Sequence, residues 1–221
     1  MVQPIGVTGP HRGLAVHTAG APLGAASAAV ILVHGRGADA SDMMDLARHL
    51  AAPGIAFLAP EAQGRTWYPY RFIEPVERNE PWLGSALAVV GGLVAAVEAE
   101  GIGAERIVLG GFSQGACLAL EFAARNPRRY GGLIGLSGGL IGPPGTTWPA
   151  AASFEGTPVL LGCSDVDPHI PLARVKETAG VFAAGGAAVD ERIYPGMGHS
   201  VNRDELDAAT ALVARLAAPE G

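Results

Sequence analysis

The residues of this chain that are best placed to do chemistry lie at positions 111–115, where Gly-Phe-Ser-Gln-Gly fits the pattern G-x-S-x-G. Residues 106–110 have an apolar centre with two β-branched side chains, Ile107 and Val108, and predict a buried strand, whereas residues 116–124 predict a helix. The small residues beside Ser113 permit a sharp turn between strand and helix. Such a turn exposes the serine hydroxyl at the strand end and directs the helix N-terminus toward it. The stretch therefore predicts a nucleophilic serine.

A serine hydroxyl needs a neutral imidazole to accept its proton, and the imidazole needs a carboxylate to hold its tautomer. In folds that place a nucleophilic serine on such a turn between strand and helix, the acid and then the histidine follow the serine in the chain. The histidines after Ser113 are His169 and His199. His199 ends a Gly-rich turn between a predicted strand and the last predicted helix, so we predict that it is the base. His169 is the weaker candidate for this role and is expected to line the mouth of a pocket.

The acid is expected at the end of a strand between the serine and the histidine. Asp165 and Asp167 both follow the predicted strand that ends at Gly162. We predict Asp167, because Pro168 fixes the turn and directs the carboxylate back over the sheet. Asp165 stays the alternative, with bracing of the turn as its other role.

Acyl transfer also needs two backbone N–H groups that stabilise an oxyanion. The amide of Gln114, directly after the serine, is the first candidate. The second is the amide of Arg36, in the loop 34–37 that follows the predicted strand 28–33. The Arg36 side chain has two interpretations: it contacts an anionic substrate, or it pairs with a nearby carboxylate.

An acyl or alcohol pocket is expected near this serine, and aromatic and aliphatic side chains in the neighbouring loops are candidates for its walls. Core packing explains the aromatic cluster equally well. The candidates are Trp67, Tyr68, Tyr70, Phe72, Leu140, Ile141, His169 and Met197.

Strand and helix patterns alternate along the chain, which predicts an α/β fold: a mostly parallel central sheet with helices on both faces. No linker or repeat interrupts the pattern, so we expect a single domain over residues 1–221. The segment after the predicted strand 132–137 is short, so no separate cap domain is expected. The other predicted strands are 28–33, 55–58, 106–110, 158–162 and 189–194, and the later predicted helices are 81–98, 171–184 and 203–217.

Composition narrows the function classes further. The net charge of −6 argues against nucleic acid or an anionic membrane as a partner. Two cysteines, Cys117 and Cys163, make no disulfide framework, and the N-terminus resembles no signal peptide, so we expect a cytoplasmic protein. Gly and Pro interrupt the uncharged stretch 13–33, which predicts no membrane span there. No metal or cofactor motif is present, and the sole lysine, Lys176, lies in a helix pattern.

Taken together, these motifs resemble those of the phospholipase/carboxylesterase family of α/β-hydrolases, which includes the acyl-protein thioesterases. The resemblance rests on residues 33–37, 110–116, 167–171 and 196–199, in the family's order. It implies an esterase with Ser113, Asp167 and His199 as the triad and the amides of Arg36 and Gln114 as the oxyanion hole. It also implies a homodimer. The aromatic run 66–72 is more similar to a bacterial esterase subgroup than to the eukaryotic thioesterases.

The sequence therefore predicts a serine carboxylesterase that hydrolyses short- to medium-chain esters of small molecules without a cofactor. A thioesterase, a lysophospholipase or a lactone hydrolase would use the same three residues. A binding protein that lacks catalysis is the alternative from a different class.

Overall fold

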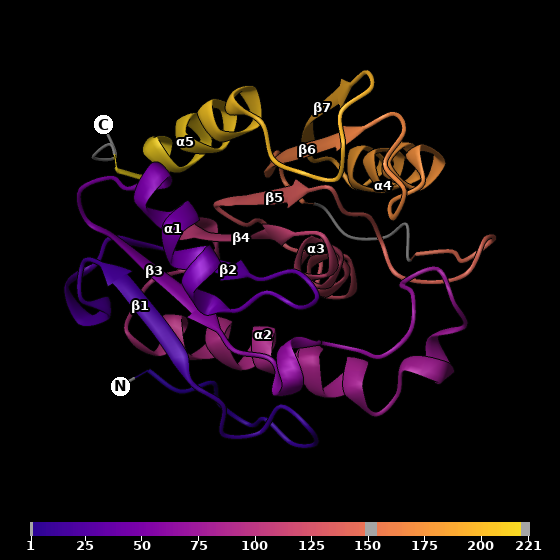
Figure 1. Ribbon diagram of the computed structural model, residues 1–221. Coiled ribbons are helices and arrows are strands. Elements are labelled where there is room, and N and C mark those ends of the chain that lie inside the picture. The colour runs from indigo at the N-terminus through magenta and orange to yellow at the C-terminus, as the bar shows by residue number, and fades with distance from the viewer. Residues whose placement is uncertain (1, 149–153, 218–221) are drawn as a thin grey trace.

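A seven-stranded sheet forms the centre of the protein, with its strands in the order β1-β3-β2-β4-β5-β6-β7 (Figure 1). The structure is a computed structural model, and it describes residues 2–148 and 154–217. The strands are β1 (Val16–Gly20), β2 (Ala28–Val33), β3 (Ile55–Pro60), β4 (Ile107–Phe112), β5 (Gly132–Leu136), β6 (Pro158–Ser164) and β7 (Ala188–Tyr194). The helices are α1 (Ala40–Leu50), α2 (Trp82–Ala99), α3 (Gln114–Arg125), α4 (Leu172–Ala184) and α5 (Arg203–Ala217).

Helices cover both faces of the sheet, as the alternating pattern predicts. Successive side chains of a strand point to opposite faces, so Val30 and Leu32 of β2 pack with α1 and α5, whereas Ile31 and Val33 pack with α2 and α3. All of β2 is buried. Strands buried on both faces read as continuous apolar runs, which is why β2 could be found in the sequence.

The edge strand β1 is absent from the sequence-based prediction. It pairs with β3 in the antiparallel sense, and the other neighbouring strands are parallel. Only Val16 of its five residues is buried. An edge strand with one buried side chain shows neither an apolar run nor a full alternation, so its sequence carries little signal.

Helix α2 is the longest apolar element. Within the described ranges it is the one helix whose length and composition would fit a bilayer span, and half of it is buried inside the protein. Leu83, Val90 and Leu93 belong to the core beneath β2 and β4. The helix serves here as a core element of the sheet's lower layer (Figure 1).

The order of the strands reverses between β2 and β4: these two strands are neighbours in the sheet, although β3 lies between them in the chain. Loops that leave the carboxyl ends of strands on either side of such a point form a crevice, where ligands of open α/β sheets bind. The loop with Arg36 leaves β2 and the turn with Ser113 leaves β4, so the topology brings them together.

Candidate active site

Ser113 occupies a strained turn between β4 and α3. Its φ of 55° and ψ of −121° are outside the regions that residues other than glycine favour. The turn is held by hydrogen bonds at both sides: the Ser113 amide donates to the Leu136 carbonyl at 2.9 Å, and the Cys117 amide donates to the Ser113 carbonyl at 3.0 Å. The strand–turn–helix geometry predicted around Ser113 is therefore present, with the serine directly before the helix N-terminus.

A continuous hydrogen-bond chain links the three candidates for the triad. His199 Nδ1 lies 2.7 Å from Asp167 Oδ2, and His199 Nε2 lies 2.8 Å from Ser113 Oγ. A carboxylate only accepts, so the proton is on Nδ1, and Nε2 is left to accept the hydroxyl proton of Ser113. The structure thus brings together Ser113, Asp167 and His199, from the ends of β4, β6 and β7.

The Asp167 carboxylate is kept ionised by its hydrogen bonds. Burial by itself raises its pKa, but the hydrogen bonds from His199 and from the amides of His169 and Ile170 outweigh burial and lower the pKa below its usual value. The two amides donate to Oδ1 at 2.8 and 3.0 Å. One oxygen is thus fixed by the backbone, and the other faces the imidazole.

Asp165, the alternative acid, has the bracing role. Its Oδ1 accepts from the amide of Gly196 at 2.8 Å, which ties the loop after β6 to the loop that carries His199. Farther along, Asn202 and Glu205 exchange hydrogen bonds at the start of α5: the Asn202 amide donates to Glu205 Oε2, and the Glu205 amide donates to Asn202 Oδ1. The loop that carries His199, residues 195–202 and called the histidine loop below, is therefore anchored at both ends.

The loop after β2 lies against the nucleophile. A Cβ built on Gly35 would lie 3.4 Å from the Ser113 Cβ, so the backbone that leads into Arg36 passes beside the serine. Buried His34 shapes this loop: its Nε2 accepts from the Ala62 amide, and burial lowers its pKa, so it stays neutral. Of the two amides predicted for the oxyanion, that of Gln114 belongs to the first residue of α3, directly after Ser113, and that of Arg36 belongs to this loop after β2.

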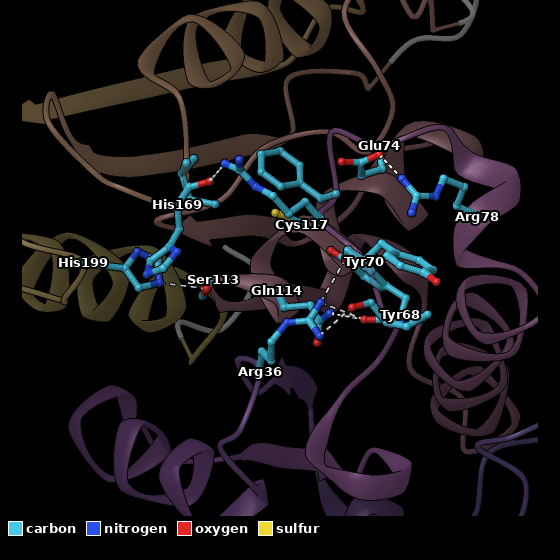
Figure 2. Close-up of a pocket in the computed structure, with 14 residues that line it drawn as sticks. Arg36, Tyr68, Tyr70, Glu74, Arg78, Ser113, Gln114, Cys117, His169 and His199 are labelled. Carbon is cyan, nitrogen blue, oxygen red and sulfur yellow. Dashed lines mark hydrogen bonds and ion pairs between the residues drawn. The ribbon is translucent and has the colours of Figure 1, made fainter.

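The side chains of Gln114 and Arg36 hold residues 67–70, the loop that carries the aromatic side chains. Gln114 accepts from the Trp67 amide and donates to the Tyr68 carbonyl, at 3.0 and 2.8 Å. The Arg36 guanidinium donates to the carbonyls of Tyr68, Pro69 and Tyr70. Of the two interpretations of the Arg36 side chain, pairing with a carboxylate does not fit the structure, because the backbone carbonyls of residues 68–70 accept from its N–H groups (Figure 2).

A cavity of about 480 Å³ opens beside Ser113 and His199 (Figure 2). Of the residues predicted for a pocket, Tyr68, Tyr70, Phe72 and His169 line it. The His169 ring stands edge-on to His199 with 4.8 Å between ring centres. The remaining residues of the wall are Arg36, Pro69, Arg71, Glu74, Arg78, Gln114, Cys117 and Ile170.

Four residues predicted for the pocket lie elsewhere. Trp67 is fully buried, and its indole N–H donates to the His34 carbonyl at 2.9 Å. Leu140 and Ile141 are buried in the core, where their amides bond to Thr178 Oγ1 and to Glu121 Oε2. Met197 lies on the histidine loop, where its Sδ accepts a hydrogen bond from Asn202 Nδ2.

The predictions for Trp67, Leu140 and Ile141 were wrong because apolar residues near a strand end serve the core as readily as a pocket. The segment after β5 illustrates this, since buried Arg174 of α4 donates to the carbonyls of Leu140 and Gly142 and draws the chain inward. Residues 149–153 of this segment lie outside the described residues.

The charged part of the pocket wall was missed. Arg71 lies within the aromatic run 66–72, and Glu74 and Arg78 follow it in the same loop; this proximity is the signal that could have found them. In the part of the chain that the structure describes, no three His, Cys, Asp or Glu side chains gather as a metal site would require. The polar groups beside Ser113 suit acyl transfer: a nucleophile, a base and the acid that orients the base.

The fold and this hydrogen-bond chain define the class of the protein, an α/β-hydrolase with a serine nucleophile. A model of the phospholipase/carboxylesterase family matches residues 17–216. The chain therefore belongs to the phospholipase/carboxylesterase family, and the family indicates a serine hydrolase.

Individual relatives agree with this family. The crystal structure of a phospholipase/carboxylesterase from Dyadobacter fermentans superposes with a TM-score of 0.87 and 40% identity, covering 96% of this chain and 98% of that one. Acyl-protein thioesterase 1 of Gibberella zeae is 37% identical over 54% of this chain and 52% of its own length. Acyl-protein thioesterase 1 of Eremothecium gossypii is 30% identical over 73% of this chain and 66% of its own length. The chain thus spans about half to two thirds of the length of these two thioesterases.

Proposed function

We propose that the protein is a carboxylesterase that hydrolyses short- to medium-chain esters of small molecules through an acyl-enzyme. The observation that carries this proposal is the hydrogen-bond chain from Ser113 through His199 to Asp167 at the wall of a cavity of about 480 Å³. A cavity of this size lies within the range of small-molecule sites and accommodates a short- to medium-chain ester.

In the proposed first half-reaction, Ser113 Oγ attacks the ester carbonyl while His199 Nε2 accepts the hydroxyl proton. Negative charge develops on the carbonyl oxygen, and the amides of Gln114 and Arg36 donate to it, each worth on the order of 3 kcal/mol of barrier. Asp167 stabilises the imidazolium and holds the ring. The tetrahedral intermediate then collapses, the bond to the alcohol oxygen breaks, and His199 gives its proton to the departing alcohol.

In the second half-reaction, water takes the place of the alcohol. His199 accepts a proton from the water as its oxygen attacks the acyl carbonyl, and the same amides donate to the oxyanion. Collapse breaks the bond to Ser113 Oγ, which recovers the proton and leaves a carboxylic acid. No cofactor enters either half.

Kinetics with p-nitrophenyl esters of increasing acyl length test this function. Where deacylation is slower than acylation, we expect an initial burst of nitrophenol whose molar amount equals that of the enzyme. We also expect kcat/KM to fall for acyl chains longer than medium length. Linear release with full activity in Ser113→Ala would overturn the acyl-enzyme. Unchanged kcat/KM for long chains would overturn the substrate class.

Hydrolysis of acyl thioesters is the second candidate, and the curated relatives named acyl-protein thioesterase 1 favour it. The same residues serve both reactions. A thiolate is the better leaving group, so it needs less protonation by His199 than an alkoxide does. Matched oxygen and sulfur esters of one acyl group decide between the two. A higher kcat/KM for the sulfur ester, beyond the ratio of their rates with hydroxide, would identify a thioesterase.

We infer a cytoplasmic protein that acts as one domain and needs neither nucleic acid nor a membrane. A homodimer is the assembly that fits the family. Light scattering of the purified protein tests the dimer, and a mass equal to one chain would overturn it.

A further inference from the structure

The cavity beside Ser113 carries more positive than negative charge, although the chain as a whole has a net charge of −6. Its wall has the side chains of Arg36, Arg71 and Arg78 but, among the described residues, only one carboxylate, that of Glu74. The Asp167 carboxylate lies behind His199, fully buried and paired with it. The excess charge therefore faces whatever occupies the cavity.

Two of the three guanidinium groups are held by hydrogen bonds of 3.0 Å or shorter. Arg78 donates to Glu74 at 2.7 Å and lies over the Tyr70 ring, 4.3 Å from its centre (Figure 2). Arg36 gives its N–H groups to the three backbone carbonyls of residues 68–70. Both side chains are fixed parts of the wall.

Arg71 differs from them. Its Nη2 makes one long contact, 3.4 Å, to the carbonyl of His169, and the described residues include no carboxylate that pairs with it. Its backbone is nevertheless anchored, because its carbonyl accepts from the Glu74 amide at 3.1 Å and from Asn79 Nδ2 at 3.3 Å. Asn79 is itself completely buried. A fixed backbone thus presents a cation that is not yet neutralised.

The position of Arg71 relates it to the reacting atoms. Its partner, His169, donates its amide to Asp167 and places its ring against His199. Arg71 and Ser113 line the same cavity of about 480 Å³. A small substrate with its carbonyl at Ser113 can therefore also reach the guanidinium.

We propose that Arg71 binds an oxyanion of the substrate, so that the preferred ester carries a carboxylate or phosphate group a few bonds from its scissile carbonyl. The planar fork of a guanidinium matches either group with two parallel hydrogen bonds. The inference rests on the proposed esterase function and names the substrate class within it. Arg71 sets specificity and takes no part in the proton transfers.

Two matched pairs of esters test the proposal and locate the oxyanion. The first pair is p-nitrophenyl hydrogen adipate and p-nitrophenyl methyl adipate, which differ by a carboxylate on the acyl side. The second pair is a butyrate ester of glycerol 3-phosphate and the same ester of glycerol, which differ by a phosphate on the alcohol side. We expect the charged member of at least one pair to have the higher kcat/KM, by about tenfold, mainly through a lower KM.

Variants then assign the preference to Arg71. Arg71→Gln should abolish the ratio of charged to neutral kcat/KM, and Arg71→Lys should restore part of it. Glu74→Gln, which removes the carboxylate from the wall, should increase the ratio. Arg129→Gln is the matched control, because it removes an exposed arginine outside the cavity and should leave the ratio unchanged.

The outcomes separate the two proposals. A preference in the first pair places the oxyanion on the acyl group, and one in the second pair places it on the alcohol. If neutral esters turn over and neither pair shows a preference, or if Arg71→Gln keeps the preference, the inference is overturned while the esterase function stands. If no ester of either pair turns over, the esterase function fails and the inference fails with it.

Discussion

At the scale of single residues, the strained backbone conformation of Ser113 exposes its hydroxyl at the end of β4. A residue other than glycine at φ 55° costs about 1–3 kcal/mol and persists only where its surroundings impose it. Here the surroundings are the sheet on one side and the first turn of α3 on the other. The gain is a hydroxyl held 2.8 Å from His199 Nε2, with the helix N-terminus behind it.

The acid can be assigned by two matched substitutions. Asp167→Asn should lower kcat by roughly 10³- to 10⁴-fold, because an amide at this position favours the wrong tautomer of His199. Asp165→Asn is the control, and we expect a much smaller loss, since Asp165 only braces Gly196. Steady-state kinetics with one ester measures both. The reverse order of effects would mean that Asp165 is the acid.

The thiol beside the pocket should be inert. Burial raises the pKa of Cys117 to about 12, and burial likewise raises the pKa of Cys163 to about 12. Only the thiolate reacts readily, so we expect neither cysteine of the native protein to react with Ellman's reagent at about pH 8, and both to react in denaturant. Rapid reaction of one thiol in the native protein, with loss of esterase activity, would contradict this.

At the scale of elements, the sharp turn from β4 through Ser113 into α3, here called the elbow, depends on how closely β2 approaches α3. A Cβ on Gly115 would collide with the carbonyl oxygens of Val33 and His34. Those oxygens belong to the backbone and cannot move without shifting the loop that carries Arg36. The glycine therefore sets the distance between the two predicted oxyanion donors.

Substitution of this glycine tests the packing of the elbow. Gly115→Ala should lower the free energy of unfolding by about 1–3 kcal/mol and reduce kcat as well. Gly180→Ala is the matched control: it lies in α4, where an added Cβ meets nothing within 4 Å, and alanine favours the helix by up to about 1 kcal/mol. Urea unfolding of both variants measures the effects. Equal stability of the two variants would show that the elbow tolerates the methyl group.

The elements that position the triad could be predicted from the sequence because their signals are local. Apolar runs mark β2 and β4, and chain order alone points to His199 after the last strand. The pocket could not be predicted in the same way. Whether Leu140 faces the cavity or the core depends on Arg174 and Thr178, which lie more than thirty residues away and hold its backbone. The charged wall around Arg71 depends equally on how one loop folds over another.

At the scale of the whole molecule, the histidine loop is anchored to a buried acid. Glu205 is completely buried, one of its carboxyl oxygens accepts from Asn202, and the other has no hydrogen-bond partner among the described residues. Burial raises its pKa. An acid whose pKa is higher in the folded than in the unfolded protein binds more protons when folded, so stability falls as pH rises between the two values.

Removal of this charge should therefore change how stability depends on pH. Relative to the wild type, Glu205→Gln should gain free energy of unfolding as pH rises from about 4.5, by at most about 1.4 kcal/mol per pH unit, until the folded-state pKa is passed. Urea unfolding at a series of pH values measures the difference. A difference that is constant with pH would show that Glu205 titrates alike in both states.

The most direct test of the central claim is to identify the residue that an active-site probe modifies. A fluorophosphonate forms a covalent bond with an activated serine and needs no knowledge of the natural ester. Peptide mass spectrometry should find one modification per chain, on Ser113, with hydrolysis of p-nitrophenyl esters lost in proportion to labelling and Ser113→Ala inert to the probe. Labelling of another residue, or ester hydrolysis that survives complete labelling of Ser113, would contradict the account.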